Sequence, residues 1–323
     1  MFRACTRFGA PSLSRQLLPA SRTCRTLTTL HQCLAPERPF LFKKEAGSPT
    51  SHLPALKKWF DRPPLSSSGV RLSPNLEEFQ DWPFPYELWT PPSEQGRPIA
   101  AFRDWLMASQ DMMDGMLAGI LQSVLEEAQH RAFFQLHAPL RLLAQAIEFN
   151  AQAVAVGSQP VQVYIAQSSI SDLPEPLQND LPAPEFVRRA GKGDVYNSSV
   201  WLGTEPTYTP LHRDPNPNLF SQLCNSKIVR LLPPALGERL FFEVQSQIRQ
   251  QASSRIRTTE MMEGKEREVL RHAVWDPEVQ LNELYEAELA DGDALFIPKG
   301  WWHSVKSKTS DGKLNASVNW WFR

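Results

Sequence analysis

Short runs of alternating apolar and polar residues fill the second half of the chain, from about residue 151 to residue 323. The runs are rich in β-branched and aromatic residues and are separated by Gly, Asn, Asp or Pro; they read VQVYIAQ, DVYNSSVWLG, NLFSQLC, KIVRLLPP, DALFIP, WHSVKS and NASVNWWFR. An alternation of period two is typical of strands with one buried face. The pattern therefore predicts an antiparallel sandwich or barrel as the main domain, residues 151–323.

A helical pattern precedes these strands, over residues 99–150. Apolar residues recur there at helical spacing and Pro139 interrupts them, so we expect two or more helices packed outside the strands. We expect the packing face of these helices to include four methionines: Met107, Met112, Met113 and Met116.

The strand pattern is interrupted at about residues 243–284. The segment there, VQSQIRQQASSRIRTTEMMEGKEREVLRHAVW, is polar and favours helix. The simplest interpretation is a helical insertion between two strands, with its charged side solvated. A lid over a binding site is the alternative.

Residues 37–98 have a different character, because proline and serine are frequent in DRPPLSSSGVRLSPNLEEF and DWPFPYELWTPP. Long helices are excluded by the prolines. The segment nevertheless carries aromatic residues: Trp59, Phe60, Trp82, Phe84, Tyr86 and Trp89. We expect an irregular arm that wraps the main domain and packs these rings against it, with an aromatic surface for substrate as the alternative.

Composition narrows the class of protein. At 323 residues and 41% hydrophobic, the chain can bury a large core, and one large domain with appendages is expected. No apolar run approaches the ~20 residues of a membrane span. The formal net charge is −1, which gives no clear footprint for nucleic acid.

The charge is unevenly distributed, since five arginines and no acidic residue precede Glu37. An Arg-rich, Ser-rich and acid-free segment without an apolar stretch is typical of a mitochondrial transit peptide, predicted over residues 1–36 and implying the matrix. A basic tail on a cytoplasmic or nuclear protein is the alternative. Three of the four cysteines lie in this segment, which leaves Cys224 alone and indicates a reducing compartment.

The stretch TPLHRDPNPNLF, residues 209–220, carries the candidate chemistry. It begins like a kinase catalytic loop, but the kinase Asn would fall at Leu219 and no DFG follows. In an extended strand, His212 and Asp214 point to the same side. His303, in the later block DGDALFIPKGWWHSV, can supply a third ligand. Two imidazoles and one carboxylate form the facial triad of non-haem Fe(II) oxygenases; a structural His–carboxylate pair is the alternative.

On these motifs the chain resembles the JmjC and cupin-like Fe(II)/2-oxoglutarate dioxygenases, in particular the small hydroxylases like factor inhibiting hypoxia-inducible factor. The resemblance covers roughly residue 161 to the C-terminus. The matching positions are Thr209, Pro210, His212 and Asp214, then Lys227 thirteen residues after the Asp, Tyr164 and Gln167, Asn218 with Phe220, and the closing Val318, Asn319, Trp320 and Trp321. It implies a mainly β fold with α elements: a double-stranded β-helix, or jelly roll, with N-terminal helices and a helical insertion between strands.

The resemblance also implies roles for single residues. Lys227 would neutralise the far carboxylate of 2-oxoglutarate, and Thr209 and Tyr164 would donate hydroxyl hydrogen bonds to it. Asn218 and Asn319 would orient the near carboxylate or the metal ligands. A solvated lysine, and a Tyr and an Asn that only satisfy the core, are the alternatives.

The implied reaction uses Fe(II), 2-oxoglutarate and dioxygen. 2-Oxoglutarate is converted to succinate and CO₂ while a substrate C–H bond is hydroxylated. Hydroxylation of a protein side chain is the preferred expectation. The alternatives are oxidation of a small molecule or a modified RNA base, and a catalytically silent cupin that serves as a binding module.

Overall fold

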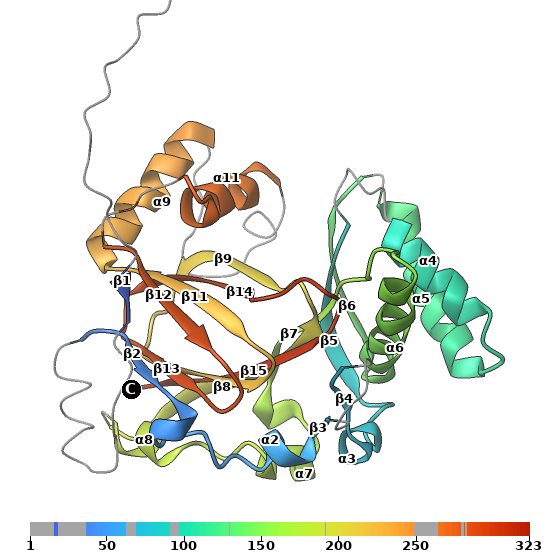
Figure 1. The fold of residues 1–323 in the computed structure, drawn as a ribbon, viewed down its shortest axis with the longest axis horizontal. Coiled ribbons are helices and arrows are strands. Elements are labelled where there is room, and N and C mark those ends of the chain that lie inside the picture. The colour runs from blue at the N-terminus through green and yellow to red at the C-terminus, as the bar shows by residue number, and fades with distance from the viewer. Residues whose placement is uncertain are drawn as a thin grey trace, which may run out of the picture.

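The protein folds into two facing β-sheets with helices on the outside (Figure 1). The structure is a computed structural model; it describes residues 16–18, 37–62, 69–90, 97–128, 130–190, 192–248, 264–278, 281 and 283–323. Thus, apart from residues 16–18, the predicted transit peptide 1–36 lies outside the described residues.

The smaller sheet carries the HRD segment. In spatial order it contains β1 (Gln16–Leu17), β12 (Tyr285–Leu289), β11 (Lys227–Leu232), β14 (Trp302–Ser307) and β9 (Tyr208–Arg213). β1 pairs with β12 in parallel, and the other pairs in this sheet are antiparallel.

The larger sheet faces it and is antiparallel throughout. In spatial order it contains β2 (Phe40–Phe42), β13 (Ala294–Ile297), β10 (Asn218–Cys224), β15 (Leu314–Phe322), β8 (Val195–Thr204), β7 (Val163–Ser169), β5 (Pro83–Trp89) and β6 (Phe133–Pro139). A separate two-stranded ribbon joins β3 (Phe60–Asp61) and β4 (Arg71–Leu72). The expected jelly roll is therefore present.

Alternation along β15 shows how one strand serves two sides of the sheet. Ala316, Val318 and Trp320 belong to the core cluster shared with the outer helices. Ser317, between two of them in sequence, reaches Lys227 of the opposite sheet. The polar positions of β15 therefore face the interior between the sheets, as period-two alternation requires.

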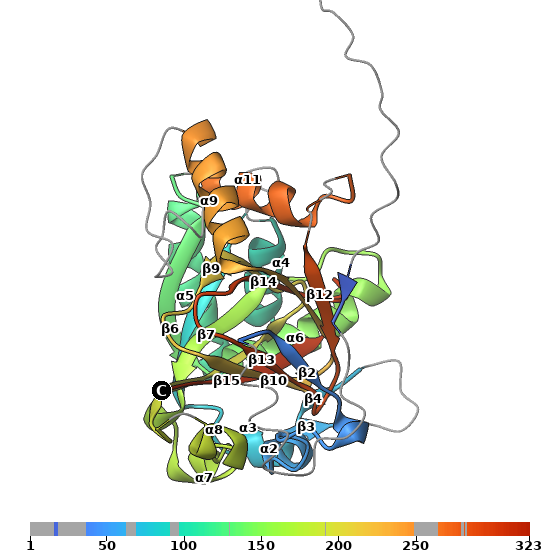
Figure 2. The same ribbon diagram turned by 90° about the vertical axis from the view of Figure 1, so that its left-hand side faces the viewer.

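Helices cover the outer side of the larger sheet. The long ones are α4 (Arg97–Met107), α5 (Met112–Glu127) and α6 (Arg141–Ala155); the short ones are η1 (Lys44–Ala46), α2 (Ala55–Lys58), α3 (Pro74–Glu77), η2 (Ile170–Asp172), α7 (Glu175–Asn179) and α8 (Glu185–Arg189). In Figures 1 and 2, α4 to α6 stand beside β5 and β6, and α2, α7 and α8 lie beneath the sheets. Among the described residues, no helix is long and apolar enough to cross a bilayer.

The insertion packs on the outer side of the smaller sheet, where α9 (Pro234–Ile248) and α11 (Gly264–Trp275) cover β9, β11 and β14 (Figure 1). The predicted start at residue 243 is wrong, because the helix already begins at Pro234. Proline is favoured in the first turn of a helix, so the Pro-Pro pair that looked like a strand end is a helix start.

Two further expectations are corrected. The arm 37–98 is not irregular throughout, since β5 joins the larger sheet between β6 and β7. Similarly, β6 lies inside the segment expected to be helical. The aromatic rings of the arm do pack inward in four cases, with Trp59, Phe60, Phe84 and Tyr86 buried.

The methionine expectation is wrong for three of the four residues, whereas Met113 is half-buried. Met107, Met112 and Met116 are 63%, 84% and 54% exposed. α5 instead buries Leu117 and Leu121, which lie on another side of the helix.

Candidate metal centre and cosubstrate pocket

Three side chains converge at one end of the interior. His212 of β9 and His303 of β14 are register partners in neighbouring strands, and Asp214 follows β9. Ligand atoms of the three residues lie within 4.8 Å of one another. The imidazole centroids are 4.1 Å apart, and His303 Nε2 is 3.6 Å from Asp214 Oδ2. These three residues could offer two nitrogens and one oxygen to a metal ion.

Backbone carbonyls orient both imidazoles. His212 Nδ1 lies 2.9 Å from the Pro210 carbonyl oxygen, and His303 Nδ1 lies 3.2 Å from that of Trp301. A carbonyl can only accept, so in each ring Nδ1 donates and Nε2 carries the lone pair. Hydrogen bonds of this kind fix the tautomer that a metal-binding histidine needs.

A β-bulge aligns the pocket side chains of β9. His303 pairs with His212 and Val305 pairs with Thr209, so β9 has one residue more than β14 between the two pairs. Cross-strand partners point to the same side of a sheet, and a bulge shifts the alternation by one. Thr209 and His212, three residues apart, therefore both face the interior.

Two consecutive amide hydrogen bonds, from Asn319 to Asn218 and from Asn218 to Asp214, orient the Asp214 carboxylate. Asn218 Nδ2 donates to Asp214 Oδ2 over 2.9 Å, and Asn319 Nδ2 donates to Asn218 Oδ1 over 2.9 Å. Asn319 Oδ1 and Ser199 Oγ, on register partners of β15 and β8, are buried without a hydrogen-bond partner. Buried polar atoms are normally satisfied, so this pair marks a place where a ligand or water would be bound.

Lys227 of β11 is buried in the same interior, at 2% exposure. Its Nζ donates to Ser317 Oγ over 2.9 Å and to Tyr164 Oη over 3.4 Å. The ammonium also lies 5.6 Å from the ring centroid of Tyr164 and 5.7 Å from that of Phe220. A buried ammonium bordered by hydroxyls is suited to bind a carboxylate.

The place of the Tyr164 ring depends on a glycine. A Cβ built on Gly203 would lie 2.4 Å from Tyr164 Cδ2 and 2.7 Å from the Val163 carbonyl oxygen. Gly203 and Tyr164 are register partners in β8 and β7. The ring can therefore lie over β8 toward Lys227 only because position 203 has no side chain.

A buried carboxyl group, Glu205, lies behind the lysine. Thr309 and Asn315 donate to its two oxygens, and Asn315 also donates to the carbonyl of Ser226 beside Lys227. Burial raises the pKa of Glu205, and the positive charge of Lys227 acts in the opposite direction. The lysine end of the pocket thus contains an acid whose charged form is disfavoured.

The structure brings all eight sequence-predicted site residues to this interior. The cluster of His212, Asp214 and His303 lies at one end and Lys227 with Tyr164 at the other, with Thr209 facing the interior between them. Asn218 and Asn319 form the two amide hydrogen bonds behind Asp214. Sequence reasoning missed Ser199, Ser317 and Glu205. The alternation in NASVNWWFR could have found Ser317, because it shares its side with Asn319; Glu205 lies after its strand, where alternation gives no information.

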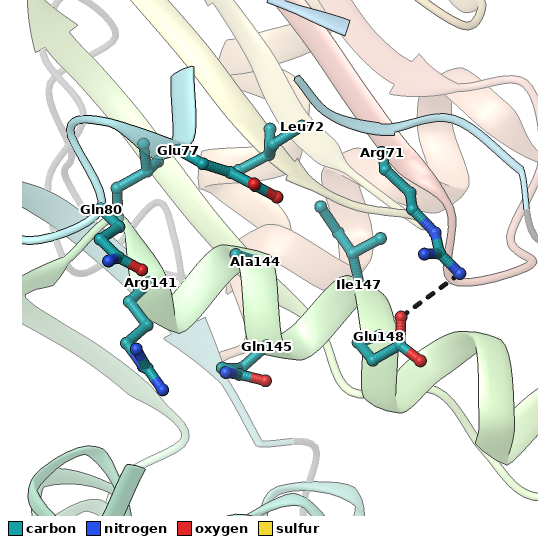
Figure 3. A pocket seen from close by; sticks show the side chains of 10 residues that line it. Arg71, Leu72, Glu77, Gln80, Arg141, Ala144, Gln145, Ile147 and Glu148 are labelled. Carbon is teal, nitrogen blue, oxygen red and sulfur yellow. Dashed lines mark ion pairs between the residues drawn. The ribbon is translucent and has the colours of Figure 1, made fainter. Parts of the chain in front are cut away.

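A groove elsewhere on the molecule contrasts with this site. It measures about 280 Å³ and lies between β4, α3 and α6 (Figure 3). Its charged lining is balanced: Arg71 pairs with Glu148 at 3.5 Å, and Arg141 is held by Asp114 at 2.9 Å. The first pair connects the arm to α6 and the second connects α6 to α5, and together they offer no convergent set of metal ligands.

Comparison with known proteins identifies related sequences. A family model described as a cupin-like domain matches residues 28–323. The chain is 27% identical over 166 residues to "Lysine-specific demethylase JMJ30" of Arabidopsis thaliana, covering 51% of this chain and 35% of that protein. It is 27% identical over 161 residues to "Lysine-specific demethylase 8" of Danio rerio (49% and 36%), and 27% identical over 165 residues to "Jumonji C domain-containing protein 5" of Drosophila melanogaster (49% and 36%).

The chain spans about a third of the length of these relatives. The family match, in contrast, runs through both sheets and the three-residue cluster. JmjC proteins use Fe(II) and 2-oxoglutarate, and the cluster and the buried Lys227 suit these two groups. The chain therefore belongs to the cupin-like JmjC family of Fe(II)- and 2-oxoglutarate-dependent oxygenases.

Proposed function

We propose that the protein is an oxygenase that hydroxylates a side chain of another protein, with 2-oxoglutarate as cosubstrate. The observation that carries this proposal is the placement of the metal-binding cluster and Lys227 in one interior. In the strand register, Lys227 of β11 lies opposite Ser307 of β14, and Ser307 is four residues after His303 on the same strand. Four residues of strand span about 13 Å, and both side chains reach into that gap, where a small dicarboxylate would be bound.

Each residue has a proposed part. His212, Asp214 and His303 would hold Fe(II). Bound Fe(II) and 2-oxoglutarate would supply the oxidising chemistry, with loss of CO₂ and formation of succinate. Lys227 and Tyr164 would bind the far carboxylate of the cosubstrate.

Three further residues would keep this arrangement in place. Thr209, on the interior side of β9, would donate its hydroxyl to the far carboxylate. Asn218 would keep Asp214 in its ligating orientation, and the unpartnered oxygen of Asn319 would bind a donor at the metal end. Together these residues fix geometry and compensate charge in a water-poor interior.

Protein as the substrate class is supported by the names of the relatives, two of which are called lysine-specific demethylases. Removal of an N-methyl group is the second candidate because it needs the same first step: a hydroxylated N-methyl group releases formaldehyde. Oxidation of a small molecule or an RNA base, and a silent binding module, stay as alternatives. We also propose that the protein acts in mitochondria, based on the acid-free, arginine-rich residues 1–36.

Succinate release from the purified protein tests the proposal. The wild type and Asp214→Ala would be incubated with Fe(II), 2-oxoglutarate and, separately, peptide, RNA and metabolite pools. We expect the peptide pool to stimulate succinate release only in the wild type. A stimulated peptide that gains one oxygen atom by mass spectrometry supports hydroxylation, whereas formaldehyde release indicates demethylation. Equal succinate in wild type and variant would refute an oxygenase, and stimulation only by RNA or metabolites would refute the substrate class.

A further inference from the structure

The larger sheet ends in an open edge, formed by β6. Among the residues that the structure describes, β6 is the last strand of the sheet and pairs only with β5. Gln135 and His137 in the middle of β6 are exposed, and Leu136 between them is half-buried. A strand in this position has one row of backbone donors and acceptors that no strand of its own sheet can use.

The hydrogen bonds between β5 and β6 show which backbone groups face outward. At one end of the ladder Thr90 N donates to the Ala132 carbonyl, and at the other end Leu140 N donates to the Trp82 carbonyl. In an antiparallel ladder, hydrogen-bonded pairs alternate with pairs whose backbone groups point away from each other. The register is unbroken between these two bonds, so the even-numbered residues of β6 bond to β5. The N–H and C=O groups of its odd-numbered residues therefore point to the open edge.

The other sheet edges in the described part of the chain are protected. β9 contains Pro210, which has no N–H group, and α11 packs against this strand. β12 is paired with β1, and Lys43 Nζ donates to the Glu288 carbonyl over 2.9 Å. β2 is three residues long. Short strands, prolines, lysines and covering elements are the usual protections of an edge. β6 is seven residues long, has no charged residue and has proline only at its end.

The open edge of β6 is complementary to a second copy of itself. With a two-fold axis through Leu136, two antiparallel β6 strands overlap along their full length. Gln135 of one copy then lies opposite His137 of the other, and their outward backbone groups form hydrogen-bonded pairs. On the opposite side of the joined sheet, Leu136 meets its own copy and Phe134 meets Ala138. Within the strand, no pair brings like charges together, which would be destabilising.

We infer that the open edge of β6 binds β6 of a second copy of the chain, so that the two larger sheets join across a two-fold axis. Each favourable contact occurs twice in such an interface. The cations nearest the strand, Arg131 and Arg141, are paired within their own chain with Glu127 and Asp111. A single strand pair is smaller than the about 1,200 to 2,000 Å² of a stable complex, so we expect a weak, concentration-dependent dimer. The inference does not rest on the proposed oxygenase function.

Analytical ultracentrifugation of the full chain over a range of concentrations tests the inference. We expect the average mass of the wild type to rise with concentration toward twice the mass of one chain. Gln135→Lys/His137→Lys places two like-charge pairs across the axis and should raise the dimer dissociation constant about tenfold or more. Gln135→Lys/His137→Glu places opposite charges at the same two pairs and should restore the dimer.

Two controls separate the edge from other causes. Both substituted positions are exposed, so the circular-dichroism spectrum and the urea midpoint of the dilute variants should match those of the wild type. Met112→Lys adds the same charge on α5, at a residue that is 84% exposed, and should dimerise like the wild type.

Several results would overturn the inference. A wild type that stays monomeric at every concentration is one, and a dimer that persists in Gln135→Lys/His137→Lys is another. Loss of the dimer in Met112→Lys would assign the contact to α5. A Gln135→Lys/His137→Glu variant that stays monomeric would reject the pairing through Leu136. A monomeric wild type whose peptide-stimulated succinate release is lost in Gln135→Lys/His137→Lys would assign the edge to a substrate protein. The mass measurement needs neither iron nor 2-oxoglutarate, so its failure leaves the proposed function untouched.

Discussion

Replacing Lys227 by Ala removes a buried ammonium from the place where the cosubstrate carboxylate is expected. The side chain is 2% exposed, so water cannot take over its role without entering the core. Loss of one partner from a buried charge pair costs about 2 to 5 kcal/mol. At about 1.4 kcal/mol per factor of ten, the dissociation constant for 2-oxoglutarate should rise roughly 30-fold or more.

The hydroxyl groups that contact Lys227 can be removed one at a time, and the loss of affinity can be compared with that of Lys227→Ala. Tyr164 and Ser317 are neutral hydroxyls, and each contributes one hydrogen bond to a charged group, which is worth about 1.5 to 3 kcal/mol. Tyr164→Phe and Ser317→Ala should therefore weaken cosubstrate binding by at most roughly 10- to 100-fold, while the buried positive charge stays in place. Lys227→Arg should restore little, because a planar guanidinium is larger and its donors have a fixed geometry.

Anaerobic titration of 2-oxoglutarate into the Fe(II)-loaded protein, followed by the metal-to-ligand charge-transfer band, measures this affinity directly. Lys306→Ala is the matched control, since Lys306 pairs with Ile228 beside Lys227 but contacts Trp275 on the outer side of the sheet. Equal affinity in wild type and Lys227→Ala would refute the assigned role. No cosubstrate binding in the wild type would favour the silent binding module.

Three other predictions follow from the structure. His212→Ala and Asp214→Ala should lose bound iron and 2-oxoglutarate turnover while the circular-dichroism spectrum stays native; wild-type iron content in either would contradict the metal assignment. Because burial raises the pKa of Glu205, the wild type should lose stability relative to Glu205→Gln as the pH rises from about 4 through the folded-state pKa. Urea unfolding of both proteins from about pH 4 to pH 8 would show it, and a pH-independent difference would count against a buried titrating acid. A reporter carrying residues 1–40 should enter mitochondria on fractionation, and a cytosolic or nuclear reporter would reject the targeting prediction.

The strands were the most predictable part of this fold. WHSVKS coincides with β14 and NLFSQLC with β10, because buried sheets impose a simple alternation on β-branched and aromatic residues. β5 was missed since Pro83 and Pro85 suggest an irregular chain. Here the first proline begins the strand and β5 still pairs on both sides.

Local spacing could not decide between two apolar sides of the same helix. α5 has Met112 and Met116 on one side and Leu117, Leu121 and Val124 on another, and only tertiary packing selects the second set. The pocket shows the same limit. Strand alternation places His212 and Asp214 together, but the bulge that turns Thr209 inward depends on pairing with β14. Pairing across the sheet cannot be predicted from local propensity.

The position of β15 has a consequence for how the protein acquires its metal. β15 lies between β10 and β8 in the larger sheet, although it is formed by residues 314–322. His303 pairs with His212 across about ninety residues of sequence. During synthesis, the ribosome releases the first two ligands long before the third ligand and the central strand. Contacts so distant in sequence form late in folding, and metal affinity is coupled to the folded state. We therefore expect iron loading of the proposed centre to follow the synthesis of β15, and a nascent chain that lacks β15 is expected to expose apolar sheet surface to chaperones.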